Sequence, residues 1–80
     1  MDQKKYEDMQ AMLNKLEDVK NSQESILDKI NHVITDLFAN PDKELEKAME
    51  EAHQKASENV ERISEAMEAF EIKFNKAQQQ

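Results

Sequence analysis

The sequence predicts an all-α protein that folds as an antiparallel two-helix hairpin of the coiled-coil type. The 80-residue chain contains no glycine and one proline, which lies near its middle. Good helix formers dominate the composition, and apolar residues recur at intervals of three and four on both sides of the proline. Strands are not expected, because β-branched residues are sparse and do not alternate with period two. We therefore expect one helical domain over residues 1–80.

The first half of the chain predicts a long helix over about residues 3–39. Its seam positions, a and d of a heptad, alternate by three and four residues. In chain order they are Tyr6, Met9, Leu13, Leu16, Lys20, Gln23, Leu27, Ile30, Ile34 and Leu37. A second apolar row, the g row, follows every seventh residue: Met12, Val19, Ile26 and Val33. An a/d seam suits one neighbouring helix, so this additional row predicts contact with a further helix.

The chain reversal is predicted in the stretch LFANPDKEL, residues 37–45. Pro41 cannot continue a helix, because it lacks a backbone N–H and clashes with the preceding turn. It also disfavours the helical conformation at Asn40. Since proline suits the first position of a helix, we expect the turn at residues 40–41, with Asn40 as the N-cap of the second helix. One straight helix kinked at Pro41 is the alternative, although a break between two equal arms favours the hairpin.

The second half predicts a helix over about residues 42–77. Its seam positions are Leu45, Met49, Ala52, Ala56, Val60, Ile63, Met67, Phe70, Phe74 and Ala77. Two successive steps of four residues, at Ala52, Ala56 and Val60, form a stutter that locally unwinds a left-handed supercoil. With the chain ends together, Tyr6 faces Phe74, and Lys20 and Gln23 fall near Asn59. We expect these three polar residues to form a layer that fixes the register.

The two helices leave an apolar face that one hairpin does not cover. We expect it to comprise Met12, Val19, Ile26 and Val33 of the first helix and Ala48, Ala52 and Ala56 of the second. Small alanine side chains let a neighbouring backbone approach, but they supply little apolar bulk. The sequence therefore predicts that two hairpins pair into a four-helix bundle, as a homodimer.

The charge distribution limits the classes of partner. The net charge is −7, with five Lys against eight Asp and Glu up to Asn40, and six Lys and Arg against ten from Pro41 on. Neither half has a basic patch, so a nucleic-acid partner is not expected. No apolar run has the length of a membrane span, so no membrane partner is expected either. The N-terminus lacks an apolar signal region, which favours a cytoplasmic location; export without a leader stays open.

Residues for catalysis or metal binding do not converge in this pattern. The chain has no cysteine, which excludes a disulfide, a thiolate nucleophile and a cysteine-based zinc site. Glu50 and His53 have the Glu-x-x-His spacing of di-iron bundles, but heptad positions b and e do not point them into a core. His32 takes an outer position, so two surface histidines are expected. A hairpin without loops has no desolvated cleft for acid–base chemistry, so we expect no catalytic residue, cofactor or small-molecule substrate.

The chain length and the turn at Asn40-Pro41 resemble those of type III secretion needle subunits. This resemblance implies a structural subunit of an exported filament. The C-terminal Ile-Ile-x-x-Phe of those subunits is not in this sequence, and neither is the Trp-x-Gly turn of other small secreted hairpins, so no family is assigned.

The sequence as a whole predicts a non-enzymatic protein–protein interaction module. The leading hypothesis is a small self-associating adaptor or inhibitor, of the type found among prophage and plasmid accessory proteins. Two alternatives stay open. One is the subunit of an exported filament or needle-like assembly, and the other is a helical half-partner that another protein completes.

Overall fold

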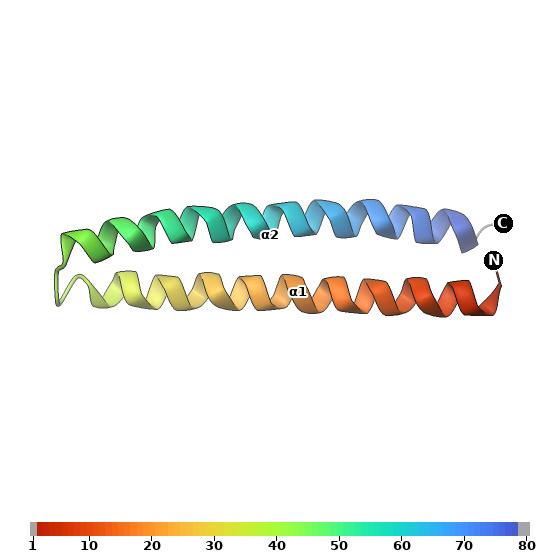
Figure 1. Ribbon diagram of the computed structural model, residues 1–80, viewed down its shortest axis with the longest axis horizontal. Coiled ribbons are helices and arrows are strands. Elements are labelled where there is room, and N and C mark those ends of the chain that lie inside the picture. The colour runs from red at the N-terminus through yellow and green to blue at the C-terminus, as the bar shows by residue number, and fades with distance from the viewer. Residues whose placement is uncertain (1, 79–80) are drawn as a thin grey trace.

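The computed structural model describes residues 2–78 as an antiparallel hairpin of two long helices (Figure 1). Helix α1 spans Gln3–Asp36 and helix α2 spans Lys43–Gln78. The helices lie side by side along their whole length and form a rod of 58 × 15 × 13 Å, with the first and last described residues at one end. The predicted hairpin is confirmed, and the alternative of one kinked helix is wrong. Pairing into a four-helix bundle stays a prediction.

Both helices begin at an aspartate N-cap. The Asp2 carboxylate accepts a hydrogen bond from the Lys5 backbone N–H at 2.7 Å, and Asp42 accepts one from the Leu45 N–H at 3.0 Å. Each carboxylate satisfies a backbone donor that has no partner within the first turn of its helix. Glu44 and Glu46 add negative charge in the first turn of α2, where the helix dipole is positive.

The turn is longer than the sequence predicts. Helix α1 ends at Asp36 rather than Ala39, and its last turn tightens, with the Phe38 and Ala39 N–H groups bonding the carbonyls three residues back. Pro41 lies outside α2, so the N-cap is Asp42 and not Asn40. The chain therefore crosses from one helix to the other over residues 37–42. No described residue has a positive φ, so the reversal is made without a left-handed cap.

Replacing Asp42 with alanine is expected to destabilise the hairpin by about 1 kcal/mol, because the N-cap hydrogen bond to Leu45 is lost. Chemical denaturation followed by circular dichroism measures the change. Asn40→Ala is the matched control, since Asn40 is also exposed in the turn but does not cap α2. An equal loss in the two variants would contradict the assignment of the cap.

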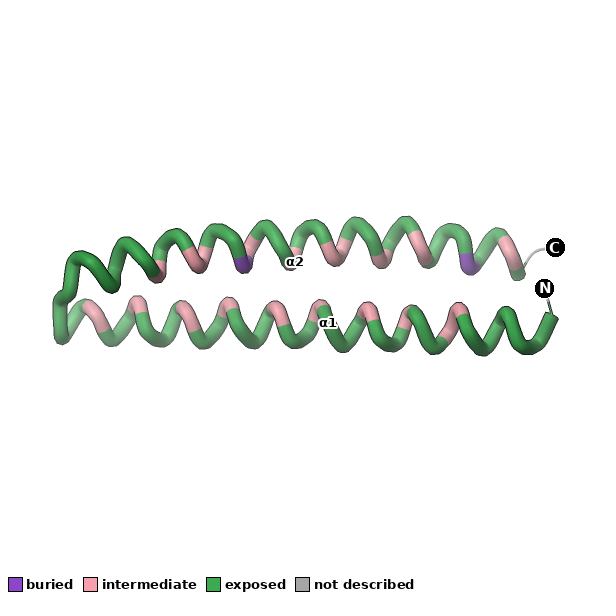
Figure 2. Tube along the Cα trace, in the orientation of Figure 1, coloured by how far each residue is buried: buried purple, intermediate pink, exposed green. Residues whose placement is uncertain are grey.

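The two helices meet along one continuous seam. Figure 2 shows the half-buried residues of each helix on the side that faces the other. Every predicted a and d position of α1 is half-buried except Tyr6, which is slightly more exposed at 37%. The aromatic rings of Tyr6 and Phe74 pack with their centroids 5.3 Å apart and tilted by 41°. This contact confirms the predicted pairing at the open end of the hairpin.

The core of the hairpin is thin. Only Ala56 and Phe74 are buried among the described residues, at 5% and 7% exposure. The rest of the seam keeps part of its surface in water, because each helix has one neighbour only. Chains of this size seldom reach comfortable stability from one such core.

Candidate interaction surface

The g row forms an exposed apolar line along α1. Met12, Val19, Ile26 and Val33 keep 46%, 45%, 45% and 37% of their surface exposed. Their spacing of seven residues is two helical turns, so the four side chains lie one behind another along one edge of the helix. The adjacent a and d residues are occupied in the seam with α2, whereas the g row extends beyond it.

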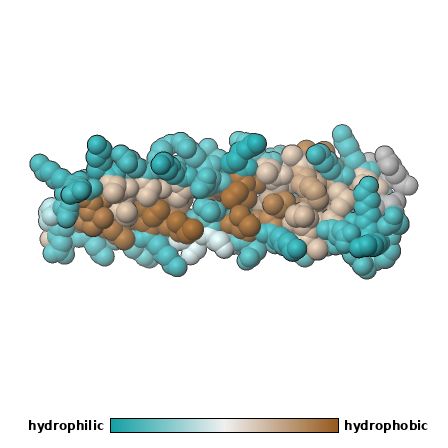
Figure 3. Space-filling view, viewed as in Figure 1, coloured by the Kyte–Doolittle hydropathy of each residue, from teal (hydrophilic) through white to brown (hydrophobic). Residues whose placement is uncertain are grey.

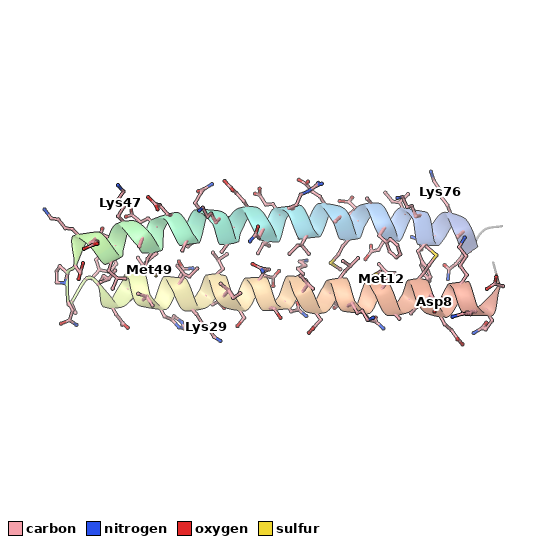
Figure 4. The ribbon with its side chains drawn as sticks, viewed as in Figure 1. Asp8, Met12, Lys29, Lys47, Met49 and Lys76 are labelled. Carbon is pink, nitrogen blue, oxygen red and sulfur yellow. The ribbon has the colours of Figure 1, made fainter. Side chains whose placement is uncertain are left out.

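A space-filling view shows apolar surface along the junction of the two helices, interrupted near the middle by hydrophilic side chains (Figure 3). Met12 of α1 and Met49 of α2 lie in the region between the helices, whereas Lys29 points away from the rod (Figure 4). The rod thus combines an apolar strip with charged flanks. That combination is typical of one half of a helical bundle.

The three alanines predicted for this surface do not share one environment. Ala48 is exposed, Ala52 is half-buried, and Ala56 is buried against α1. Ala56 is therefore part of the seam inside the hairpin and is not available to a partner, which corrects the predicted face. Leu45 is more exposed than predicted: the heptad places it in the seam, but 42% of its surface is accessible. The helices begin to pack closely only beyond the turn.

The predicted polar layer forms only in part. Lys20 and Gln23 are half-buried in the seam, but Asn59 is exposed. On α2, Val60 is half-buried at this level, as predicted for a seam position, and Ser57 is half-buried with it. The Lys20 ammonium lies 4.0 Å from the Glu24 carboxylate of its own helix, a partly exposed pair that does not link the helices.

Apart from the g row, an exposed apolar side chain, Phe38, lies in the turn. Phe38 is 83% exposed, the highest value among the exposed large hydrophobic residues. Beside it is a small depression of about 140 Å³ lined by Ile34, Leu37, Phe38, Glu46 and Glu50. The heptad pattern did not indicate this group, because Phe38 follows the last regular turn of α1.

The described residues do not assemble a metal-binding cluster. Within residues 2–78, no group of three or more His, Cys, Asp or Glu side chains lies close enough to hold an ion. His32 is exposed as expected, whereas His53 is half-buried at the edge of the seam rather than fully solvated. The ion pairs Lys4–Asp8 and Arg62–Glu65 join neighbouring turns of a single helix at exposed positions, where they contribute little to stability.

Neither α1 nor α2 combines the length and the apolar composition that a membrane-spanning helix requires. No family model matches the chain, and neither the curated proteins nor the solved structures that were compared with it give a match.

Proposed function

We propose that this protein is a non-enzymatic protein–protein interaction module that self-associates through the g row of α1 to form a four-helix bundle. The observation that carries the proposal is the exposure of Met12, Val19, Ile26 and Val33, each more than a third accessible in the single hairpin. Four apolar side chains aligned over three heptads are more than scattered surface hydrophobicity. Exposed apolar surface gathered along one edge of a protein in this way marks an interaction site.

The energetics of the single hairpin support association. Its seam buries two residues, Ala56 and Phe74, and leaves the remaining contacts half-exposed. Burying one large aliphatic side chain contributes about 1.5–3 kcal/mol. A second hairpin over the four g-row residues therefore adds several kcal/mol, from which the entropic cost of association is subtracted. Pairing supplies the apolar burial that a chain of this size lacks.

The proposed biological role is that of a small adaptor or inhibitor, of the type that prophages and plasmids encode as accessory proteins. In the bundle, the exposed carboxylates of both copies remain on the outer surface, where a second protein can bind. A cytoplasmic location accompanies this proposal. The alternative is that this protein is a helical half-partner. In that case a different helical protein, and not a second copy of this chain, covers the g row.

Thermal unfolding across a hundredfold range of protein concentration tests self-association. Because association stabilises the folded chain by mass action, the midpoint is expected to rise with concentration. Sedimentation equilibrium is expected to give twice the mass of the chain, which is 9.4 kDa. A concentration-independent midpoint together with a monomeric mass would exclude self-association and leave the g row to a different protein.

The exposed turn favours one second candidate, the subunit of a filament or needle-like assembly. Phe38 at 83% exposure and Leu45 at 42% place apolar surface at one end of the rod, away from the middle of the g row. A contact between this end and the side of another copy is heterologous, and such a contact generates an open assembly when its rotation does not close into a ring. In that case the mass grows continuously with concentration, and Phe38→Ser abolishes the growth.

A further inference from the structure

The g row is self-complementary when two copies of α1 run antiparallel. Its four members are evenly spaced, so a two-fold axis between Ser22 and Gln23 brings each apolar side chain opposite another one. Met12 then faces Val33 of the second copy, and Val19 faces Ile26. We propose, on the basis of the self-association above, that the second copy binds in this arrangement, with α1 against α1 and the two turns at opposite ends of the bundle.

The other symmetric arrangement places the turns at the same end and lays the g row on α2 of the second copy. At the level of Val19 and Ile26, the exposed face of α2 carries Asn59, with Lys55 and Arg62 one helical turn on either side. The two most central apolar side chains would then be buried against an amide and two cations. Burying polar groups without partners is unfavourable, and in the α1–α1 arrangement Val19 and Ile26 meet each other instead, so that arrangement is the better complement of the g row itself.

The size of the face agrees with a stable pair. The rod is 58 Å long and 15 Å wide, so the projected area of one side is comparable with the surface of about 800 Å² that each partner buries in a standard interface. In an isologous pair both copies use this same surface, and the assembly closes at two. Apolar surface lies along the helix junction on both sides of the hydrophilic interruption near the middle (Figure 3).

Charges at the rim of the interface do not override the apolar match. Lys15 lies between Met12 and Val19 on the outer side of the row, and Lys29 lies between Ile26 and Val33 in the same way. The antiparallel pairing brings Lys15 of one copy near Lys29 of the other. Both lysines are exposed, so water and salt screen their repulsion, whereas the apolar row is desolvated.

Distances between nitroxide spin labels, measured by pulsed electron paramagnetic resonance, test the arrangement. The chain has no cysteine, so Gln3→Cys and Ser25→Cys each introduce a single labelling site, and both positions are exposed. With the turns at opposite ends, the two Gln3 labels lie about 58 Å apart at 1.5 Å per residue from the two-fold axis. The two Ser25 labels, near that axis on neighbouring helices, are expected about 15–25 Å apart, given an interaxial distance of about 8–10 Å.

Two other results are possible, and each of them contradicts a different part of the proposal. A dimer with Gln3 labels less than about 35 Å apart has its turns at the same end, because the labels are then separated only by the width of the bundle, about two helix diameters of 10–12 Å plus the label side chains. That result, or a mixture of the two distances, would overturn the α1–α1 arrangement and leave self-association intact. A monomeric mass without any distance between copies would overturn the proposed self-association and this inference with it. Circular dichroism of each labelled variant shows whether the hairpin remains folded.

Discussion

Replacing Val19 and Ile26 together with aspartate is expected to convert the dimer into a monomer. Both side chains are 45% exposed in the single hairpin and central in the proposed interface. Four apolar side chains per dimer are lost from the interface, at about 1.5–3 kcal/mol each when fully buried, and four carboxylates take their places. Since about 1.4 kcal/mol corresponds to a tenfold change in affinity, association is expected to weaken at least about a thousandfold. Sedimentation velocity over a range of concentrations measures the mass.

The matched control is the double variant Asn14→Asp and Asn21→Asp. These asparagines lie on the same helix, have the same spacing of seven residues, are exposed, and acquire the same added charge. Asn14 accepts a hydrogen bond from Gln10 through its side-chain oxygen, which aspartate also provides. A control that remains dimeric attributes the effect to the g row and not to net charge. If the Val19 and Ile26 variant also remains dimeric, the g row is not the interface.

Replacing Phe74 with alanine is expected to open the free end of the hairpin and to cost about 3 kcal/mol. Phe74 is one of two buried residues, at 7% exposure, and its ring packs on that of Tyr6. Because Tyr6 is the single tyrosine of the chain and there is no tryptophan, the intrinsic fluorescence reports this contact directly. We expect the Tyr6 emission of the folded variant to approach that of the unfolded chain.

Ile72→Ala is the control for this prediction. Ile72 lies two residues away on the same turn of α2, but it is 50% exposed. Its truncation is expected to change stability by less than about 1 kcal/mol in the single hairpin, because little apolar contact is lost. Equal losses for the two variants would show that the open end is frayed and that the Tyr6–Phe74 contact is not formed in solution.

The candidate surface is only partly predictable from the sequence. The exposure of Met12, Val19, Ile26 and Val33 follows from a heptad that has more apolar rows than one neighbour can cover. The different exposures of Ala48, Ala52 and Ala56 do not follow from the sequence, because the three residues are of one type and the pattern of apolar residues does not distinguish them. Their exposure depends on how quickly the helices converge beyond the turn, which is a property of the packed pair. The exposure of Phe38 likewise depends on the path of the chain after α1 ends.

The sequence by itself determined that the protein is a two-helix hairpin. A chain without glycine, with one central proline and two apolar heptad arrays, has few other ways to bury its seam, and the Tyr6–Phe74 pairing follows from the equal arms. Only the tertiary structure decided that Asp42 caps α2 and that Ser57, and not Asn59, lies beside Val60 in the seam with α1. The physical reason is the same in both cases. Local preferences rank neighbouring candidates almost equally, and the choice between them is made by the path of the chain through the turn and by the packing of α2 on α1, which exist only once the helices are in contact.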